Sequence, residues 1–226
     1  MAEQLPLPLP VRAALGREDY FVSTANALAV AMVEGWRDWP QRKLVLLGPS
    51  GSGKTHLAHV WAAQSGATIL PAQDLAQADI PRLAEAPACV EDVQRIAGEP
   101  AAEEALFHLH NLCLAEGRAL LLTAVRPPMR WGLTLPDLQS RLEGTQSVSL
   151  SDPDDALLTA LLAKLFADRQ IVPDATVIPY LVAHMPRSYA AARQMTEALD
   201  RAALSAKSRI TRPMAVQMVA RLDEPD

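Results

Sequence analysis

The sequence predicts an α/β protein in which helices cover both faces of a parallel sheet and an all-helical domain follows. Between residues 20 and 150, short apolar runs alternate with helical patterns, which is typical of β-α-β units. From 151 to 226 only helical periodicity occurs, without a strand pattern. We therefore divide the chain into an extended tail at 1–19, an α/β domain at 20–150 and a helical domain at 151–226.

The composition is that of an ordinary globular chain with an acidic balance. Of 226 residues, 50% are hydrophobic and 21% are charged, and the net charge is -5, which argues against disorder. The negative charge and the few aromatic residues (4%) argue against a protein that mainly grips nucleic acid. Cys89 and Cys113 lie in apolar stretches, as buried reduced thiols do. Without a signal peptide or an apolar run of ~20 residues, we expect a cytoplasmic protein with no membrane contact.

The tail combines alternating prolines with alternating leucines. Prolines at positions 6, 8 and 10 disfavour a helix and keep the peptide extended. The leucines are Leu5, Leu7 and Leu9. An apolar peptide of this kind suggests a docking segment, and the alternative is an ordinary proline-rich tail.

The α/β domain begins with a helical pattern from Ala25 to about Arg37, which Ser23 or Thr24 can cap. The apolar run KLVLL at 43–47 is expected to be a buried parallel strand, and a glycine loop and a helix at 55–64 follow it.

Three further short apolar runs predict strands at 68–70, 88–90 and 119–123, and 148–150 is expected to add one more. A helix at 103–116 lies between two of them, with Gly117 as its C-cap.

Four helices are expected in the last domain. The first spans 154–168, the second starts at Pro173, the third follows a Ser188 cap to about Ser205, and Thr211 caps the fourth, with Pro213 just inside it.

The glycine loop reads GPSGSGKT from Gly48 to Thr55 and fits G-x-x-x-x-G-K-[ST] in full. Glycines let several backbone N–H groups face one anion, and the helix N-terminus adds partial positive charge. Lys54 is expected to reach the β- and γ-phosphates, and the Thr55 hydroxyl to ligate Mg²⁺. A chance match is the alternative, but the strand before the loop and the helix after it argue against that. The expected nucleotide-binding residues here are Gly48, Ser50, Gly51, Ser52, Gly53, Lys54, Thr55 and His56.

A phosphate-binding loop needs a second strand that ends in carboxylates. The run at 88–90 continues into Glu91 and Asp92. We expect Glu91 to hold Mg²⁺ and Asp92 to polarise the attacking water, although the sequence does not decide which one holds the metal. A solvated acidic turn is the alternative. Because the usual metal-binding residue is Asp, the longer Glu91 side chain predicts poorer alignment of water.

Together these motifs resemble the AAA+ ATPase region of the DnaA replication-initiator family, and in particular its Hda-type regulators, which switch the initiator off. The carrying segments, over about 20–222, are GPSGSGKTHLAH, VEDVQRIAG, LLLTAVRPP, LPDLQSRL and ARQMTEALDRA. The resemblance implies an AAA+ P-loop αβα sheet with an all-α lid. It also implies a negative regulator of replication initiation that holds ADP or ATP and stimulates ATP hydrolysis by DnaA.

The resemblance also assigns the tail. Gln4, Leu5, Leu7 and Leu9 are similar to the peptide with which Hda-type proteins bind the DNA polymerase sliding clamp. Such a regulator is cytoplasmic and becomes nucleoid-associated through the clamp. The chain ends at Asp226 with no room for a DNA-binding domain, so we expect no direct sequence-specific DNA binding.

The resemblance further gives roles to two arginines. Arg141 matches the arginine finger that reaches the nucleotide of a neighbouring subunit, and its alternative is a surface charge. Arg193 matches the lid arginine that contacts nucleotide in the same subunit, with Arg187 and Arg201 as competitors. The segment 20–26 matches the stretch that borders the adenine pocket, with Tyr20, Phe21 and Val22 as its expected walls, although these side chains could equally belong to the core.

The chain departs from the family pattern before Arg-Pro-Pro, where Val125 stands in place of a polar residue, commonly Asp. Thr123 remains. With Glu91, this predicts weak intrinsic hydrolysis. Two other functions stay open: an autonomous ATPase such as a helicase loader, and a non-hydrolysing adaptor. Head-to-tail homo-oligomers are a further expectation.

Overall fold

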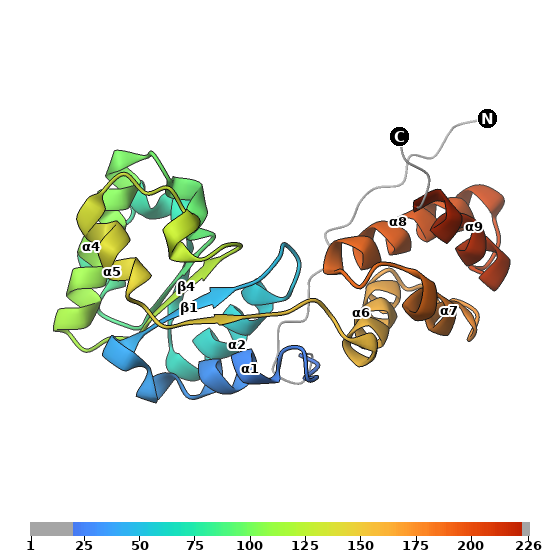
Figure 1. Ribbon diagram of the computed structural model, residues 1–226, viewed down its shortest axis with the longest axis horizontal. Helices are drawn as coiled ribbons and strands as arrows, with labels where there is room; N and C mark the ends of the chain where they lie inside the picture. The colour runs from blue at the N-terminus through green and yellow to red at the C-terminus, as the bar shows by residue number, and fades with distance from the viewer. Residues whose placement is uncertain (1–19, 223–226) are drawn as a thin grey trace.

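A sheet domain and a helical domain are joined by one extended stretch of chain (Figure 1). This computed structural model describes residues 20–222. The predicted clamp-binding peptide, Gln4 to Leu9, therefore lies outside the described residues. We call residues 20–150 the sheet domain and 151–222 the lid.

The sheet domain contains five parallel strands in the order β2-β3-β4-β1-β5. They are β1 (Lys43–Leu47), β2 (Thr68–Pro71), β3 (Ala88–Glu91), β4 (Leu120–Ala124) and β5 (Ser147–Ser149). The two central strands, β1 and β4, are buried along their whole length, as their continuous apolar runs predict. Because all strands run the same way, the loops that follow β1, β3 and β4 meet at one edge of the sheet.

Helices cover both faces of the sheet, which confirms the predicted αβα architecture (Figure 1). The main ones are α1 (Ala27–Glu34), α2 (Lys54–Ser65), α4 (Pro100–Ala115) and α5 (Pro136–Glu143). The shorter ones are α3 (Ile80–Leu83) and the 3-10 helices η2 (Trp36–Asp38), η3 (Pro40–Arg42), η4 (Ala72–Gln77), η5 (Val93–Ile96) and η6 (Pro128–Arg130).

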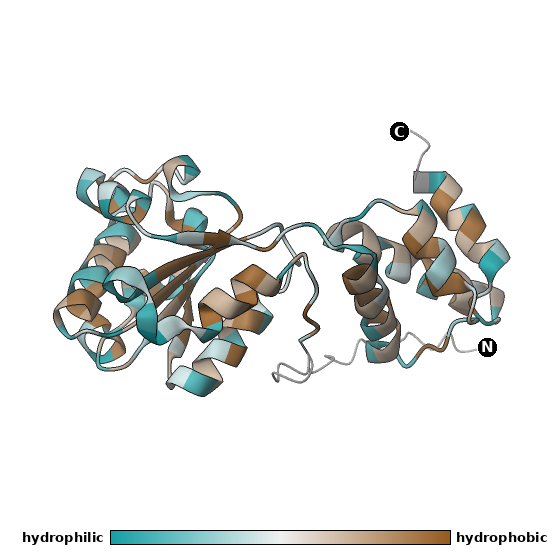
Figure 2. Ribbon diagram, turned by 60° about the horizontal axis from the view of Figure 1, so that its bottom comes forward, coloured by the Kyte–Doolittle hydropathy of each residue, from teal (hydrophilic) through white to brown (hydrophobic). Residues whose placement is uncertain are grey.

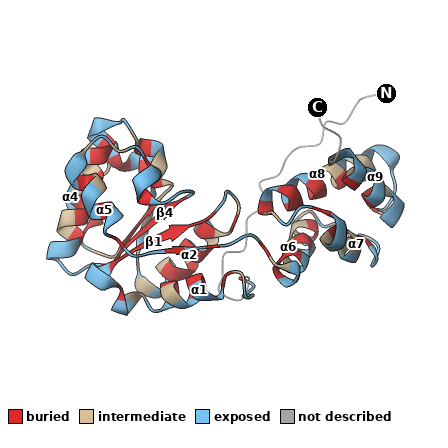
Figure 3. Ribbon diagram, in the orientation of Figure 1, coloured by how far each residue is buried: buried red, intermediate tan, exposed pale blue. Residues whose placement is uncertain are grey.

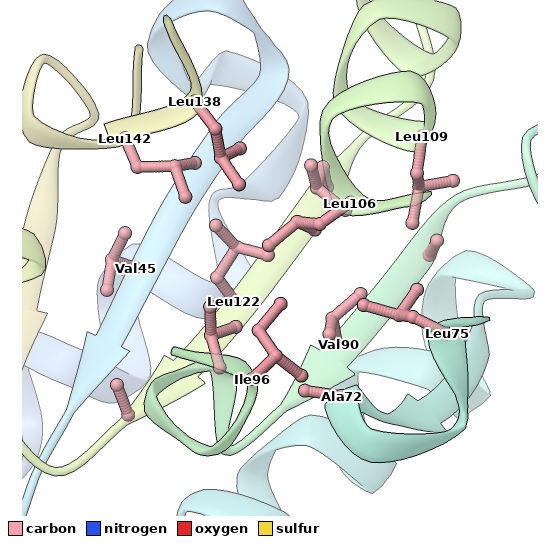
Figure 4. Packing of buried hydrophobic residues seen from close by; sticks show 14 of the residues in the cluster. Val45, Ala72, Leu75, Val90, Ile96, Leu106, Leu109, Leu122, Leu138 and Leu142 are labelled. Atoms are coloured by element: carbon pink, nitrogen blue, oxygen red, sulfur yellow. The ribbon is translucent and has the colours of Figure 1, made fainter. Parts of the chain in front are cut away.

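Each face of the sheet has its own apolar cluster. On one face, strand residues such as Val45 and Leu122 pack against Leu106 of α4 and Leu142 of α5 (Figure 4). On the other face, α1 and α2 cover the sheet around the fully buried Trp61. Figure 3 shows the central strands β1 and β4 buried, whereas the outer faces of the helices are exposed.

The lid contains α6 (Asp155–Asp168), α7 (Val177–His184), α8 (Tyr189–Ala206) and α9 (Arg212–Leu222). Their apolar faces form a third cluster that is separate from the sheet domain. Figure 2 shows apolar and polar residues alternating along these helices. Ser188 caps α8 through its side chain, as predicted, and Asp154, which was expected to be the first helical residue, caps α6 in the same way.

Three predicted helix starts are wrong, and one of them is that of α4, which begins at Pro100 and not at Glu103. The first helix begins at Ala27 with no side-chain cap, because the Thr24 hydroxyl bonds to Asp154 instead. The second lid helix begins at Val177, because the Asp174 N–H donates to the Ile210 carbonyl and holds the chain after Pro173 in a turn. Within residues 20–222, no helix has the length and apolar character needed to cross a bilayer.

Candidate functional site

The glycine loop lies between the end of β1 and the start of α2, as predicted. Gly51 and Gly53 have φ values of 84° and 92°, which other residues rarely adopt. A Cβ atom at Gly51 would lie 2.7 Å from Nη1 of Arg193, and one at Gly53 would lie 3.3 Å from the Tyr20 ring. The loop therefore needs glycine for its turns and for the close approach of two side chains.

The Lys54 ammonium is held by the loop itself. Its Nζ donates to the carbonyl oxygens of Gly48 at 2.8 Å and Pro49 at 3.0 Å. Burial lowers the pKa of Lys54, and the nearby carboxylates of Asp92 and Glu91 oppose that shift. A buried cation that is satisfied only by neutral carbonyls will gain from an anion placed beside it.

Ser52 shows that the loop can accept such an anion. Its side chain is 3% exposed, and its Oγ has no hydrogen-bond partner. An unpaired buried hydroxyl is costly, and a phosphate oxygen is a strong acceptor that would satisfy it. This orphaned hydroxyl, the N-terminus of α2 and the Lys54 ammonium form a donor set that fits a phosphate group.

A cavity of about 870 Å³ opens from the loop toward the lid. One wall is the segment Tyr20–Val22, which we call the wall segment, and Asn26 lies beside it. The opposite wall is one face of α6, formed by Leu157, Ala160, Leu161, Lys164, Leu165 and Asp168. A largely apolar slot that leads to an anion site suits a ligand with a flat ring at one end and phosphates at the other.

Arg193 is the lid arginine that reaches this cavity. It projects from α8, and its Nη2 donates to the Gly51 carbonyl at 3.3 Å. Of the two competitors, Arg187 pairs with Asp155 at 2.8 Å, and Arg201 bonds to the Glu197 carbonyl within its own helix. Neither competitor lines the cavity.

The two acidic residues after β3 have different surroundings. Asp92 lines the cavity, whereas Glu91 does not. Asp92 has φ 55°, and its N–H donates to the hydroxyl of the buried Thr123 at 3.1 Å, which ties β3 to β4. The hydroxyl of Thr55 and the carboxylate of Asp92 thus open onto one cavity, and both are oxygen ligands of the kind that Mg²⁺ prefers. Among the described residues no group of three His, Cys, Asp or Glu forms a metal site. A Mg²⁺ ion here would therefore also need oxygen atoms from the molecule bound in the cavity.

Arg141 lies far from this cavity. It belongs to the last turn of α5, where its carbonyl accepts from Lys43 Nζ at 3.4 Å and from the Thr145 hydroxyl at 3.0 Å. Lys43 begins β1, whereas the glycine loop follows its end, and a five-residue strand is about 16 Å long. The exposed guanidinium of Arg141 stands over the Phe107 ring at 5.1 Å, at the edge of the sheet opposite the loop.

Known proteins share this arrangement in structure more than in sequence. No family model matches the chain. Domain III of the replication initiation protein DnaA from Thermotoga maritima superposes with a TM-score of 0.74 over 96% of this chain and 100% of that one, at 17% identity. The chain has the fold of DnaA domain III.

Longer DnaA structures agree with this result. DnaA bound to AMPPCP and single-stranded DNA has a TM-score of 0.63 and 20% identity, over 84% of this chain and 67% of that one. AMPPCP-bound DnaA from Aquifex aeolicus has a TM-score of 0.64 and 20% identity, over 83% and 64%. The AAA+ αβα sheet with a helical lid is therefore confirmed as the fold of this chain.

Sequence reasoning missed several cavity residues of the DnaA-like fold. They are Lys164, Asp168 and Tyr189, which line the lid side. The signal for the α6 residues was present, because positions 157, 161, 164, 165 and 168 share one helix face. Nothing in the sequence shows that this face meets the glycine loop, since that depends on how the two domains dock.

Proposed function

We propose that this chain binds ADP or ATP with Mg²⁺ in the cavity and acts as a negative regulator of replication initiation. The observation that carries the binding proposal is the glycine loop, which lines the cavity together with the lid and contains an unpaired Ser52 hydroxyl and a buried Lys54 ammonium. Two solved proteins of the same fold are DnaA molecules bound to AMPPCP, an adenine nucleotide analogue, which supports adenine as the base.

Binding would exchange hydrogen bonds within the protein for bonds to the ligand. Lys54 and Arg193 now donate to loop carbonyls, and phosphate oxygens would take their place as stronger, charged acceptors. Thr55 would ligate Mg²⁺, together with Asp92 or Glu91, and the ion would neutralise phosphate charge. Because Asp92 lines the cavity and Glu91 does not, we assign the metal contact to Asp92 first.

Intrinsic hydrolysis is expected to be slow. The carboxylate of Asp92 accepts from Gln94 Nε2 at 3.4 Å and pairs with Arg95 at 3.4 Å. Both contacts draw the carboxylate away from the role of polarising water. Val125, where the family commonly has a polar residue, supplies only its N–H, which donates to Gln94 Oε1 at 3.2 Å.

Action on a partner is supported by the position of Arg141. Its guanidinium is exposed on the edge opposite this chain's own cavity, and within 20–222 no carboxylate pairs with it. A ring face holds a cation without neutralising it. In our proposal Arg141 reaches ATP on DnaA and promotes its hydrolysis, and the peptide Gln4 to Leu9 brings the protein to the sliding clamp on DNA, in the cytoplasm.

The test measures ATP hydrolysis by DnaA in the presence of clamp-loaded DNA. We expect the full chain to stimulate hydrolysis, and Arg141→Ala or deletion of residues 1–19 to abolish the stimulation. Arg118→Ala, which changes an exposed arginine just before β4, is the matched control and should behave like the unmodified chain. If Arg141→Ala stimulates as well as the control, the proposal fails.

The same assay separates the other two functions. An autonomous ATPase would hydrolyse ATP rapidly without DnaA, and Lys54→Ala would abolish that turnover. A non-hydrolysing adaptor would leave the hydrolysis rate of DnaA unchanged in Arg141→Ala. Our proposal requires slow turnover alone, and nucleotide binding that Lys54→Ala weakens by at least about tenfold.

A further inference from the structure

One carboxylate joins the lid to the sheet domain beside the cavity. Asp154 ends the linker, residues 150–154, and caps α6 through Oδ1, which accepts the Leu157 N–H at 2.8 Å. Its Oδ2 accepts from the Thr24 hydroxyl at 2.7 Å and from the Ala25 N–H at 3.3 Å. The same side chain therefore holds the first turn of a lid helix and the segment that precedes α1.

The Asp154 bonds are made by an ionised carboxylate. The Leu157 N–H and then the Thr24 hydroxyl, as the two largest causes, lower the pKa of Asp154 to about 2. Hydrogen bonds to an ionised acceptor are shorter and stronger than those between neutral groups. The contact between Asp154 and Thr24 is thus present across the whole neutral pH range.

The segment that Asp154 contacts is held in one conformation by its own hydrogen bonds. Asn26 is 2% exposed, its Nδ2 donates to the Phe21 carbonyl at 2.9 Å, and its Oδ1 accepts the Ser23 N–H at 2.8 Å. Residues 21–26 thus form one hydrogen-bonded turn. Because the wall segment is part of that turn, its distance from α6 depends on where Thr24 is held.

Other hydrogen bonds between the lid side and the sheet domain reach the glycine loop, the linker itself and the Ala25 end of this turn. Arg193 bonds to the glycine loop at Gly51, and Tyr189 bonds to the linker at Ser151. The Ser151 N–H lies 3.4 Å from the Ala25 carbonyl, a longer contact between neutral groups. Asp154 is accordingly the charged contact between the start of α6 and the turn that continues the wall segment.

We propose that Asp154 is a positioning residue for the base-binding half of the cavity. Its bond to Thr24 sets the width of the slot between the wall segment and α6, where a nucleoside would insert. The glycine loop binds the phosphates and has no bond to Asp154. Removing the bond should therefore weaken binding of a nucleotide and leave binding of its bare phosphate chain unchanged. This inference rests on the nucleotide binding proposed above.

Two variants of the full chain remove the bond in different ways. Thr24→Val replaces the hydroxyl with a methyl group of similar shape. Asp154→Ser keeps a good helix cap, but its short side chain cannot also reach Thr24. Thr159→Val is the control, because the Thr159 hydroxyl bonds only to the Asp155 carbonyl on the exposed side of α6.

The measurement is the affinity of each protein for Mg-ADP and for inorganic tripolyphosphate. Loss of one charge-assisted bond predicts about a tenfold loss of ADP affinity in Thr24→Val and in Asp154→Ser. Because Asp154→Ser removes the Ala25 bond as well as the Thr24 bond, the double variant should be no worse than Asp154→Ser alone. Tripolyphosphate affinity should stay unchanged in all variants. Equal losses for both ligands, or no loss for either, would overturn the proposal.

A second readout tests the bond between Asp154 and Thr24 even if the unmodified chain binds neither ligand. That outcome would refute the proposed nucleotide binding. Spin labels at Glu104→Cys and Arg201→Cys, both exposed, report the distance between the sheet domain and the lid. The native Cys89 and Cys113 are buried and will not react. The distance distribution should broaden in Asp154→Ser and Thr24→Val but not in Thr159→Val. Identical distributions would show that the bond between Asp154 and Thr24 does not position the lid.

Discussion

The sheet domain and the lid place their polar side chains in opposite ways. Within residues 20–222, eight of the nine buried polar or charged residues belong to the sheet domain. The lid buries only Thr196, whose hydroxyl donates to the Ala192 carbonyl of its own helix. The ion pairs of the lid lie at its surface, as between Arg169 and the acids Glu197 and Asp200. The domain that holds the glycine loop is therefore organised by internal polar bonds, and the lid by apolar packing.

The reason for this difference is what each domain must hold in place. Parallel strands deliver loops to one edge, and those loops have backbone groups that no regular structure satisfies. Buried side chains such as Glu103 and Asn26 satisfy them and fix the loop shapes. Helices satisfy their own backbone, so the lid needs only apolar faces and caps.

Replacing Glu103 should give the largest loss of stability. Its buried carboxylate accepts the N–H groups of Gly98, Thr134 and Leu135 and the hydroxyl of Thr134. Glu103→Leu leaves these donors unpaired, so urea unfolding should show a loss of about 3–5 kcal/mol. Glu104→Gln, at the exposed neighbouring position, should change little. A loss below about 1 kcal/mol would show that internal polar bonds do not organise the sheet domain.

Truncating the apolar core of the lid should cost less and act locally. Leu199 is fully buried in the lid cluster, and Leu199→Ala is expected to destabilise the lid by about 2–4 kcal/mol. Hydrogen exchange should then accelerate in α6 to α9, while the strands keep their protection. Leu204→Ala, at an exposed position of the same helix, is the control. Equal acceleration in the strands would mean that the two domains share one cooperative core.

The buried pair of Lys43 and His110 predicts a pH dependence of the sheet domain alone. Lys43 Nζ donates to His110 Nε2 at 2.9 Å, and Arg141 of α5 also faces this pair. Burial, then Lys43, lowers the pKa of His110 below its usual value of 6.5. Below pH 6.5, His110 therefore binds a proton more readily in the unfolded chain than in the folded one. The free energy of unfolding consequently falls as the pH drops below 6.5.

The expected slope is at most about 1.4 kcal/mol per pH unit, the value for one proton. His110→Gln keeps an acceptor for Lys43 and should remove this part of the pH dependence. His108→Gln, at an exposed position of the same helix, should not. Unfolding free energies measured between pH 5 and 8 would decide, and parallel curves for all three proteins would contradict the prediction.

The smallest effect is expected at the surface of the lid. Glu197 pairs with Arg169 at 3.6 Å, but its side chain is 57% exposed. Glu197→Gln should therefore change the unfolding free energy by less than about 1 kcal/mol, and added salt should shrink the difference further. A larger loss in urea unfolding would mean that ion pairs, and not apolar packing, hold the lid together.

Much of this molecule follows from local sequence. The run KLVLL, the glycine loop and the helix after it form together because strand, turn and capping preferences act over a few residues. The caps at Asp154 and Ser188 follow for the same reason. The wrong start at Pro173 shows the limit, because a bond to Ile210, far along the chain, overrides the local preference for a helix.

The strands, the phosphate loop and the apolar helices of the lid could therefore be predicted, since each depends on neighbours within one or two turns. Packing in three dimensions explains which lid arginine reaches the loop, why Asp92 and not Glu91 lines the cavity, and why Arg141 lies on the far edge of the sheet. It also brings Asp154 to Thr24 across 130 positions. Such contacts depend on how the two packed domains dock. The residues that make them have no local sequence pattern from which the contacts could be predicted.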